Sequence, residues 1–592
     1  MLRFTTRPEL TGTFGMVAAT HWLSAQAGMS MLELGGNAFD AAAAAGFVLQ
    51  VVEPHQNGIG GEAPMVLYSA SEDQVFVVCG QGVAPKGATL DAFDQLGLDL
   101  VPGAGLLAAC VPAAFGSWLL LLERFGTMSL RQVISPALGY ARDGFPTAPI
   151  LSRVLGEIAA RLREEWPTSA EIWLADGVPQ PGQKIRNPLL AATYQRLVDE
   201  GEAAGSSREA QLEGARRAFY EGFVAEAIGE FAKTPQIDPH GRHAGFITPG
   251  DMAAWRASLE PPVSYPYRDF EVFKTGPWGQ GPVMLQQLAL LSGYDIASLG
   301  EGSAELIHLV TECSKLAFAD RDAYYGDPAF TDVPLDVLLS DDYNSERRRL
   351  VGEEASLELR PGRPGGRTPT LPDWREVAAT PRGDDARTGD PTAGPTKADN
   401  DTVHLDAADR FGNLISCTPS GGWLQSSPAV AGLGFCLGTR GQMFWLKEGL
   451  ATTLRPGARP RTTLSPSLAF RDGEPYMAFG TPGGDQQDQW PLRTFLYHAD
   501  LGLDLQAAID ASIWHHQHFY DSFYPRQFAP GSLHLEASLG QETIAALKGR
   551  GHRVTEAGRW SLGRQTAVRR SSDGLLHAAS DPRSSQAYAV GR

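Results

Sequence analysis

A short run of alternating hydrophobic and polar residues stands out in the last third of the chain. Val403, Leu405 and Ala407 alternate with more polar neighbours, which is typical of a half-buried β-strand. The five residues that begin at Asp409, Asp-Arg-Phe-Gly-Asn, carry turn-forming side chains, and a second short strand follows them. The pattern therefore predicts a β-hairpin that begins at Thr402.

The rest of the chain divides into a mixed α/β opening, a mainly helical middle and a strand-rich end. The middle runs from residue 113 to about residue 350 and carries one strand pair near 263–272. No unit of 20–50 residues repeats, which argues against a solenoid. The other predicted strands cover residues 14–19, 65–69, 74–79, 465–470, 475–479, 563–570 and 574–578, and the other predicted helices cover residues 24–34, 37–52, 282–291, 304–325, 489–501 and 505–512.

Residues 353–400 differ in composition from the sequence around them. They are rich in Pro, Gly and charges of both signs, which is typical of a flexible surface segment. Thr402 follows this segment at an abrupt change from polar linker to buried strand. If the chain is cut before Thr402, that residue gains a free α-amine beside its hydroxyl and combines a nucleophile with a base. On the hairpin alone, the plainer interpretation also stands, namely a β-branched residue that opens a strand.

Composition narrows the class of protein. A chain of 592 residues predicts two domains or one large multilayer core. Its net charge of −18 argues against non-specific binding to nucleic acid or to an anionic membrane surface. Its five scattered cysteines lack ligand spacing and predict buried free thiols. No signal-peptide or transmembrane pattern is recognisable, so a cytoplasmic location is expected.

A run of histidines, His515, His516 and His518, suggests a metal site at first sight. Adjacent histidines point in different directions on a strand or helix, and no Cys or carboxylate lies at ligand spacing from them. We therefore expect no metal, and the sequence indicates no other cofactor.

Two features have the chemistry to assist Thr402. Gly483 and Gly484 follow a predicted strand, where successive backbone N–H groups can face a developing oxyanion. Thr418 and Ser420 lie on the return strand of the hairpin, and residues on paired strands face each other, so one of these hydroxyls can hydrogen-bond the Thr402 region. Each feature alone is also compatible with an ordinary turn or strand.

Together with these residues, a series of motifs resembles the γ-glutamyltransferase family of N-terminal-nucleophile hydrolases over nearly the whole chain. Each motif alone is weakly specific, but their order and spacing together are a strong indication. The motifs are GGNAFDA at 35–41, GIGG at 58–61, YARDGF at 140–145, FYEG at 219–222, DRDAYYGDP at 320–328, DTVH at 401–404, PRTTLSP at 460–466, TPGG at 481–484 and ASDPRS at 579–584.

The resemblance implies an α+β fold, a four-layer αββα sandwich. It also implies autocatalytic cleavage between Asp401 and Thr402. The large chain would hold residues 1–401, with an α/β part, a helical middle and the flexible tail, and the small chain would hold residues 402–592. The two chains of this precursor would stay associated and form the fold jointly.

The same resemblance assigns catalytic roles. Thr402 Oγ would be the nucleophile for self-cleavage and for attack on the substrate, and its α-amine would be the general base. The N–H groups of Gly483 and Gly484 would form the oxyanion hole. Ser420 falls where the family has a second Thr that supports the hydroxyl of the nucleophile.

The residues expected around the substrate depart from the family pattern. The family holds the α-carboxylate of a γ-glutamyl group with an Arg and a Ser-Ser pair, and the amino group with an Asn, a Gln and an Asp. Here a cation is lost at the carboxylate end, and at the amino end an acid is lost and a cation gained. The positions are Gln81, Thr462 and Thr463 at the carboxylate end and Gly422, Arg440 and Met443 at the amino end, with Thr418 and Asp485 as further expected contacts.

A charge-assisted hydrogen bond contributes about 1.5–3 kcal/mol, so these losses predict acyl-transfer machinery without tight γ-glutamyl specificity. Arg440 either holds a carboxylate of a different acyl group or is a structural arginine. The substrate hypotheses are a γ-glutamyl compound such as glutathione, a different small amide such as a dicarboxylic monoamide or a β-lactam side chain, and a carbon–carbon bond beside a carbonyl, as in alkylproline antibiotic pathways. An inactive scaffold of the same fold is the alternative from another class.

Overall fold

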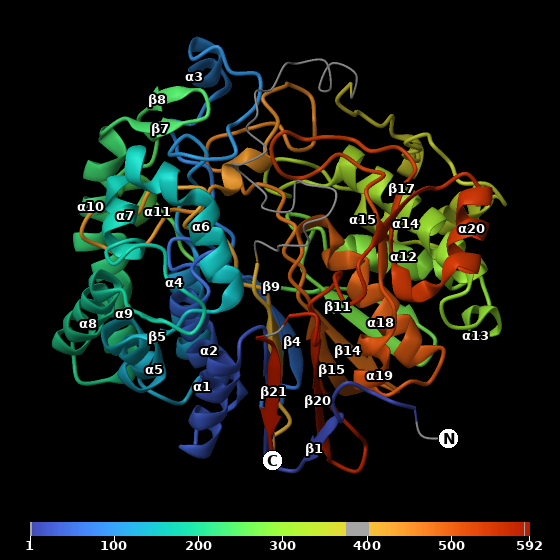
Figure 1. Cartoon of the computed structure of the whole chain (residues 1–592), viewed down its shortest axis with the longest axis horizontal. Coiled ribbons are helices and arrows are strands. Elements are labelled where there is room, and N and C mark those ends of the chain that lie inside the picture. The colour runs from blue at the N-terminus through green and yellow to red at the C-terminus, as the bar shows by residue number, and fades with distance from the viewer. Residues whose placement is uncertain (1–2, 374–401, 585) are drawn as a thin grey trace.

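Two seven-stranded antiparallel sheets lie face to face between two layers of helices (Figure 1). The computed structural model describes residues 3–373, 402–584 and 586–592. Asp401, on one side of the expected cleavage site, lies outside these residues. The order of layers is helix, sheet, sheet, helix, so the predicted α+β sandwich is confirmed.

The hairpin predicted after Thr402 forms the centre of one sheet, whose strand order is β21-β2-β12-β13-β3-β4-β9. Because the hairpin has a neighbouring strand on each side, hydrogen bonds fix its register in both directions. Its strands are β12 (Leu405–Asp409) and β13 (Leu414–Cys417), and the others are β2 (Gly15–Ala19), β3 (Met65–Ser69), β4 (Gln74–Cys79), β9 (Ser258–Glu260) and β21 (Tyr588–Gly591).

The second sheet has the order β1-β20-β19-β15-β14-β11-β10 and combines strands from both ends of the chain. Its strands are β1 (Leu10–Gly12), β10 (Val263–Tyr267), β11 (Phe270–Lys274), β14 (Ser467–Arg471), β15 (Glu474–Gly480), β19 (Thr566–Arg570) and β20 (Leu576–Ser580). Smaller sheets pair β5 (Phe145–Pro146) with β6 (Lys184–Ile185), β7 (Gln236–Asp238) with β8 (Gly241–His243), and β16 (Trp514–His516) with β17 (Ser532–Glu536) and β18 (Arg553–Ala557).

Helices from the first half of the chain cover the sheet that holds the hairpin, and later helices cover the second sheet, on the left and right of Figure 1 respectively. None of the described helices is long and apolar enough to cross a bilayer. The first group is α1 (Trp22–Glu33), α2 (Ala38–Val52), α4 (Ala114–Phe125), α5 (Leu130–Asp143), α6 (Pro149–Glu164), α7 (Pro167–Trp173), α8 (Pro188–Ala203), α9 (Arg208–Tyr220), α10 (Phe223–Lys233) and α11 (Pro249–Ala254), whereas α3 (Leu90–Gln95) packs in a separate cluster with Leu107 and Phe444. The second group is α12 (Pro282–Leu291), α13 (Ile296–Leu299), α14 (Ala304–Tyr324), α15 (Leu335–Leu338), α16 (Asp341–Arg348), α18 (Trp490–Ala499), α19 (Leu505–Asp510) and α20 (Gln541–Gly549).

The two faces of β12 are both buried, which corrects the expectation of a half-buried strand. Leu405 and Ala407 pack into the core beneath the first helical layer. The opposite face, with His404 and Asp406, has no exposed surface because the second sheet covers it. Alternation in a sequence shows that two faces differ in chemistry, but here the polar face meets another sheet and not water.

The turn of the hairpin is anchored to the helical layer by Asp409. Its carboxylate accepts hydrogen bonds from the N–H groups of Ala38 (2.8 Å), at the start of α2, and Asn413 (3.1 Å). Asn37 caps the same helix and forms a reciprocal capping box with Asp40. The helix start and the hairpin turn are therefore fixed to each other.

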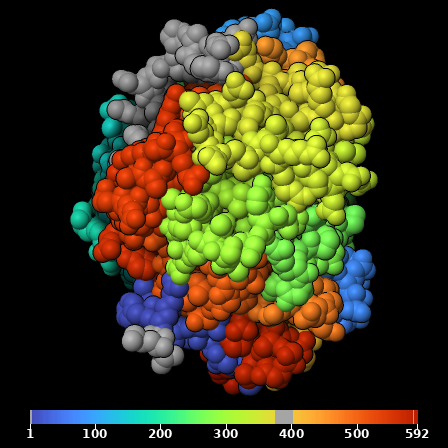
Figure 2. Space-filling view, turned by 90° about the vertical axis from the view of Figure 1, so that its right-hand side faces the viewer, coloured from blue at the N-terminus to red at the C-terminus, as the bar shows by residue number. Residues whose placement is uncertain are grey.

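The first part of the segment expected to be flexible packs against α14. Gly362 N–H donates to Asp320 (2.6 Å), Ser356 N–H donates to Glu312 (3.3 Å), and Tyr324 donates to the carbonyl of Gly362 (2.8 Å). Figure 2 shows the yellow part of the chain around residue 350 spread over this face of the molecule. Residues 353–373 are thus held by buried partners, and 374–400 lie outside the described residues.

Candidate active site

Thr402 and Ser420 form a buried hydroxyl pair at the open end of the hairpin. The β12–β13 register pairs Leu405 with Cys417, and continued toward the open end it places Thr402 opposite Ser420, where an antiparallel bridge joins them. Their hydroxyl oxygens lie 3.1 Å apart, within hydrogen-bonding distance. Neither side chain is exposed. The predicted support of Thr402 by Ser420 therefore has the required geometry.

Arg440 contacts Ser420 of this pair and also forms a buried ion pair with Glu62. Its Nη2 donates to Ser420 Oγ at 2.8 Å, and its Nε and Nη2 lie 2.6 and 2.5 Å from Glu62 Oε1. Arg440 and Glu62 are both buried, where an unpaired charge would be strongly unfavourable. Of the two interpretations of Arg440, the structure supports the structural one, because Glu62 already neutralises the guanidinium.

Glu62 is a site residue that the sequence did not reveal. It lies in the Gly-rich loop before β3, and its backbone exchanges two 2.9 Å hydrogen bonds with Ser420. Gly61, the residue before it, lies so close to the backbone of Ser420 that an added Cβ would be 2.0 Å from the carbonyl oxygen of Ser420. Only a glycine allows this approach. The GIGG motif was the available signal, but nothing in it shows that the next residue faces an arginine 378 positions away.

Met443 and Gly422 complete this end of the site without adding charge. Met443 is buried in a cluster with Trp423 and Phe523, and its Sδ lies 3.9 Å from Arg440 Nη1. Gly422 has a positive φ of 69° and lies against the Gly-rich loop. These positions therefore offer no carboxylate to a substrate ammonium group.

Thr418 belongs to a polar ladder between the two sheets, which differs from its expected contact with substrate. Its hydroxyl lies 2.9 Å from His404 Nδ1, and His404 Nε2 lies 3.0 Å from Asp406. Asp406 in turn accepts a 2.6 Å hydrogen bond from Thr566 on the second sheet. Thr402, His404 and Asp406 alternate along one strand face, so this ladder ties the nucleophile's strand to both sheets.

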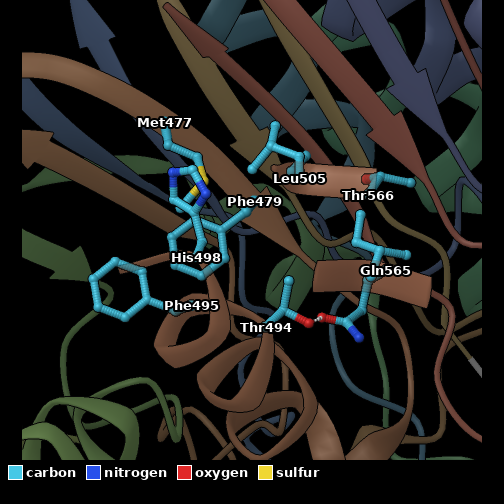
Figure 3. A pocket seen from close by; sticks show the side chains of 10 residues that line it. Met477, Phe479, Thr494, Phe495, His498, Leu505, Gln565 and Thr566 are labelled. Atoms are coloured by element: carbon cyan, nitrogen blue, oxygen red, sulfur yellow. Dashed lines mark hydrogen bonds between the residues drawn. The ribbon is translucent and has the colours of Figure 1, made fainter. Parts of the chain in front are cut away.

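A small cavity of about 10 Å³ borders the far end of the ladder at Thr566 (Figure 3). Phe479, Phe495 and Leu505 give it a mainly apolar lining. It offers room for about one water molecule. It is therefore too small to be the substrate site.

Gly483 and Gly484 have the backbone shape expected of an oxyanion hole. Their φ angles are +129° and +54°, which residues with a side chain rarely adopt. Gln280 donates weakly to the carbonyl of Gly484 (3.4 Å). Within the described residues neither glycine N–H donates a hydrogen bond. Phe523 packs against Gly484, and its ring centre lies 5.7 Å from Arg440 Cζ, so Gly484 and the arginine that binds Ser420 adjoin the same aromatic ring.

Asp485 is engaged in a buried ion pair and differs from the expected substrate contact. Its Oδ1 accepts from Arg321 Nη1 and from Ser522 Oγ (2.6 Å), and its Oδ2 accepts from the N–H of Ser522 (2.9 Å). Burial opposes ionisation of this carboxyl, but Arg321 and then Arg461 outweigh it, so the pKa of Asp485 is lowered. Asp485 is a fixed anion that holds the segment after the glycines.

Three residues expected at the carboxylate end of the substrate are buried and incompletely hydrogen-bonded. Within the described chain, Thr463 Oγ1 and Gln81 Oε1 have no hydrogen-bond partner. Thr462 accepts only a long 3.3 Å bond from the N–H of Leu464. Gln81 borders a cavity of about 420 Å³. These groups are available to a ligand, as buried polar atoms without partners are uncommon.

Histidines of the run near residue 515 hydrogen-bond to neighbouring groups of the protein. His516 lies 2.8 Å from Ser314 Oγ, and His518 lies 3.0 Å from the carbonyl of Glu358. Elsewhere, His308, Glu312 and His552 are the one group in the described chain with metal-ligand spacing. Lys315 and Arg360 already bind the Glu312 carboxylate, at 2.6 and 3.1 Å, which disfavours a cation there. All five cysteines lie in the described residues and are buried free thiols, as predicted.

The αββα sandwich and the threonine at the start of a central strand define the class of N-terminal-nucleophile hydrolases. A sequence model described as Gamma-glutamyltranspeptidase matches residues 24–591. The chain therefore belongs to the gamma-glutamyltranspeptidase family, whose enzymes are hydrolases and acyltransferases made as proenzymes.

Individual relatives cover the whole chain. It is 30% identical to the glutathione hydrolase-like YwrD proenzyme of Bacillus subtilis (strain 168), over 97% of this chain and 98% of that protein. It is 52% identical to the solved structure titled LmbA2991HD, which it matches with a TM-score of 0.93 over 100% of both chains. The cephalosporin acylase of Bacillus halodurans is 26% identical, with a TM-score of 0.82 over 99% of this chain and 97% of that one.

Proposed function

We propose that the chain cleaves itself between Asp401 and Thr402 and then hydrolyses a small amide through an acyl-enzyme on Thr402. The observation that carries this proposal is the 3.1 Å hydroxyl pair of Thr402 and Ser420 at the open end of a buried hairpin. The family membership and the two positive-φ glycines support it.

Self-cleavage would begin with attack of Thr402 Oγ on the carbonyl carbon of Asp401. The C–N bond breaks, the former peptide nitrogen becomes the α-amine of Thr402, and the carbonyl is transferred to Oγ as an ester. Water then hydrolyses the ester and leaves a carboxylate on Asp401. This order converts a peptide nitrogen, which is not basic, into the amine that later turnover needs.

In turnover the α-amine accepts the proton of Thr402 Oγ while the oxygen attacks the substrate carbonyl. The oxyanion would be held by the N–H groups of Gly483 and Gly484, a contribution typically of about 3–4 kcal/mol for one such donor. The α-ammonium then protonates the leaving amine, and an ester on Thr402 remains. Water attacks this ester by the reverse proton path and releases the acid.

The acyl group that fits this site best is not γ-glutamyl. Arg440 is committed to Glu62 and Ser420, and Gly422 and Met443 offer no negative charge to an α-ammonium group. A substrate ammonium would therefore lose ion pairs that contribute about 1.5–3 kcal/mol each. An amide with a different small acyl group is the preferred substrate class, in agreement with the acylase among the similar structures.

A second candidate is hydrolysis of a carbon–carbon bond beside a carbonyl. The specific observation in its favour is that Gly422 and Met443 offer no charge to an amino group, and an oxyanion hole can stabilise the oxyanion formed by attack on a ketone as well as on an amide. Release of a carbon leaving group instead of an amine would distinguish it.

The test is mass spectrometry of the purified protein. We expect two polypeptides, with Thr402 at the N-terminus of the smaller one, and after brief exposure to an acyl anilide an added acyl mass on the Thr402 peptide. Thr402→Ala should remain one chain and gain no acyl mass. An uncleaved, fully active Thr402→Ala protein would contradict the proposal.

A further inference from the structure

Lys274 is a fully buried lysine at the edge of the second sheet from which the chain leaves toward Gly483. It is the last residue of β11, and the β11–β14 register, continued by one residue, places it opposite Ser467. Ser467 in turn pairs with Phe479 near the end of β15, the strand that the two glycines follow. None of the lysine side chain is exposed. A buried ammonium group therefore lies where the glycines leave the sheet, and it has no part in the proposed reaction.

Three partners surround this ammonium group. Its Nζ donates to Ser467 Oγ at 2.8 Å and to the carbonyl of Ser465 at 3.0 Å, and it lies 3.1 Å from Asp488 Oδ1. Asp488 is equally buried, and its Oδ1 accepts a 2.7 Å hydrogen bond from Ser465 Oγ. Asp488 is the last residue of the short 3-10 helix Gly484–Asp488, which begins at the second glycine. Lys274 thus joins the second sheet to the turn that carries the glycines.

Burial makes the two members of this ion pair depend on each other. It is the largest effect on both groups, because it lowers the pKa of Lys274 and raises the pKa of Asp488. In each case the opposite charge of the partner offsets part of the shift. Removal of one partner would leave the other charge buried without compensation, which strongly destabilises a folded protein. Lys274 therefore restricts where Asp488, and the turn that ends there, can lie.

The bonds made by the carbonyl groups of this turn determine the direction of its N–H groups. In a trans peptide the C=O and the N–H point in opposite directions. The carbonyl of Gly483 accepts from the N–H of Gln486 at 3.0 Å, so the N–H of Gly484 points away from the turn. Gln287 Nε2 donates to the carbonyl of Asp488 at 2.8 Å, next to the Lys274 ion pair. The turn is therefore held from the side opposite to the Gly484 N–H.

The lysine cluster also reaches the hairpin of Thr402. The N–H of Ser467 donates to Ser416 Oγ, on β13, at 3.3 Å. The same Ser416 oxygen lies 3.4 Å from His404 Nε2, two residues after Thr402. Lys274 is therefore connected to the glycine turn through Asp488 and to the strand of the nucleophile through two serines.

We propose that Lys274, paired with Asp488, is a positioning residue that holds the N–H groups of Gly483 and Gly484 against the hairpin of Thr402. Lys274 acts through the turn and not on the reacting atoms. A displaced N–H group still allows the substrate to bind but no longer meets the oxyanion, so the effect falls on the transition state. This inference rests on the proposed function and concerns how its oxyanion hole is held in place.

The first experiment is steady-state hydrolysis of butyryl-p-nitroanilide, with each rate divided by the amount of chain that carries an N-terminal Thr402. Lys274→Met removes the ammonium group and keeps a side chain of similar length. We expect kcat to fall about 10- to 100-fold, because a displacement of about 1 Å can have this effect, while KM stays within about threefold. An unchanged kcat in Lys274→Met would overturn the proposal.

Butylboronic acid provides a readout that does not need turnover. Thr402 Oγ forms a bond to boron, its proton passes to the α-amine, and the boron becomes a tetrahedral anion with an oxygen in the oxyanion position. Calorimetry should show at least 10-fold weaker binding of butylboronic acid to Lys274→Met than to wild type. Butyrate, whose carboxylate is planar, should bind both proteins within about threefold. Equal binding of the boronic acid to both proteins would contradict the positioning role.

The double variant Lys274→Met with Asp488→Asn separates positioning from stability. It leaves no buried charge unpaired, so its Tm should recover most of what Lys274→Met loses. Its kcat should stay at least 10-fold below wild type, because the link between sheet and turn is still missing. If Lys274→Met does not fold, the double variant replaces it in every comparison. Recovery of kcat together with Tm would show that the lysine only stabilises the fold.

The matched control is Lys315→Met, which breaks a second buried lysine–carboxylate pair. Lys315 Nζ lies 2.6 Å from Glu312 and donates to the carbonyl of Ser356 at 3.0 Å. This variant should lose stability as Lys274→Met does, with kcat and boronic acid affinity unchanged. An equal fall of kcat in both variants would overturn the proposal.

Two further outcomes separate this inference from the proposed function. A wild-type protein in which no acyl group forms on Thr402 would contradict the proposed function. Acylated Thr402 in the wild type, with wild-type kcat and boronic acid affinity in the Lys274 variants, would contradict the positioning role alone.

Discussion

Arg440 Nη2 donates a 2.8 Å hydrogen bond to Ser420 Oγ, the oxygen that lies 3.1 Å from Oγ1 of Thr402, the proposed nucleophile. A guanidinium only donates, so Ser420 must accept in this bond, and its own O–H can donate to Thr402 Oγ1. Ser420 would then stabilise negative charge on the threonine oxygen as it loses its proton. The ion pair with Glu62 thereby serves the nucleophile without contacting the substrate.

Replacement of Ser420 separates this role from simple packing. Ser420→Ala should slow self-cleavage and lower kcat by about 10- to 100-fold, because the transition state loses one hydrogen bond while Arg440 keeps an unsatisfied donor. Ser420→Thr, which retains the hydroxyl, should stay within about threefold of wild type. Rates of chain cleavage on denaturing gels and single-turnover rates measure both effects. Equal damage from both substitutions would point to packing instead.

The Glu62–Arg440 pair should be costly to break from one side only. Glu62→Gln leaves the buried guanidinium without its counter-charge, and the expected loss is about 3–5 kcal/mol in the free energy of unfolding. Arg440→Met with Glu62→Gln should lose less than the sum of the single variants, because no charge stays unpaired. Urea denaturation of the four proteins completes the cycle. Additive losses would show that the two residues do not interact.

The residues around the substrate that depart from the family pattern predict weak turnover of γ-glutamyl compounds. Because Gly422 and Met443 offer no carboxylate and Glu62 is paired with Arg440, kcat/KM for γ-glutamyl-p-nitroanilide should fall at least 10-fold below that for the anilide of a comparable acyl group without the ammonium. Steady-state assays at one pH provide the comparison. Strong turnover of the γ-glutamyl substrate at micromolar concentration would contradict the assignment of Gly422 and Met443.

A buried carboxyl beside the hairpin makes stability depend on pH. Glu53 accepts from Thr20 (2.8 Å) and Gln586 (3.0 Å), and burial raises its pKa from 4.5 to about 7. A raised carboxyl pKa favours the protonated folded state, so its contribution is fully present below pH 4.5 and is lost as pH rises through 7. The difference corresponds to about 3 kcal/mol.

Glu53→Gln is the matched variant for this effect, since the amide is always neutral, its oxygen can still accept from Gln586, and its NH2 group can donate to the Thr20 hydroxyl. Chemical denaturation between pH 4.5 and 8 should show that wild type loses about 3 kcal/mol more than Glu53→Gln across the range. Parallel curves for the two proteins would show that Glu53 ionises at the same pH folded and unfolded.

Much of the local structure follows from sequence alone. The strands expected at 65–69 and 74–79 are β3 and β4 with the same bounds, and the helix expected at 37–52 is α2, capped by Asn37. These features depend on neighbours in the chain, on turn residues and on capping groups. The Thr402 hairpin also follows from its own residues, and the motifs along the whole chain together indicate the family.

Local sequence patterns could not predict which residues pair with the buried charged side chains. The sequence left Arg440 open between a substrate contact and a structural role, and the structure places Glu62, 378 positions away, against it. Asp485 was expected at the substrate, and the structure pairs it with Arg321, 164 positions away. Burial makes each of these ion pairs necessary, because a buried charge without a partner destabilises the folded protein.

The sequence by itself indicated the candidate nucleophile, the hairpin that carries it and the two glycines proposed for the oxyanion hole, because each depends on a few consecutive residues. Only the tertiary structure decided that both faces of the hairpin are buried, that Arg440 pairs with Glu62 and donates to Ser420, and that Asp485 pairs with Arg321. These outcomes depend on which distant elements pack together, and alternation along one strand shows only that its two faces differ, not what covers them.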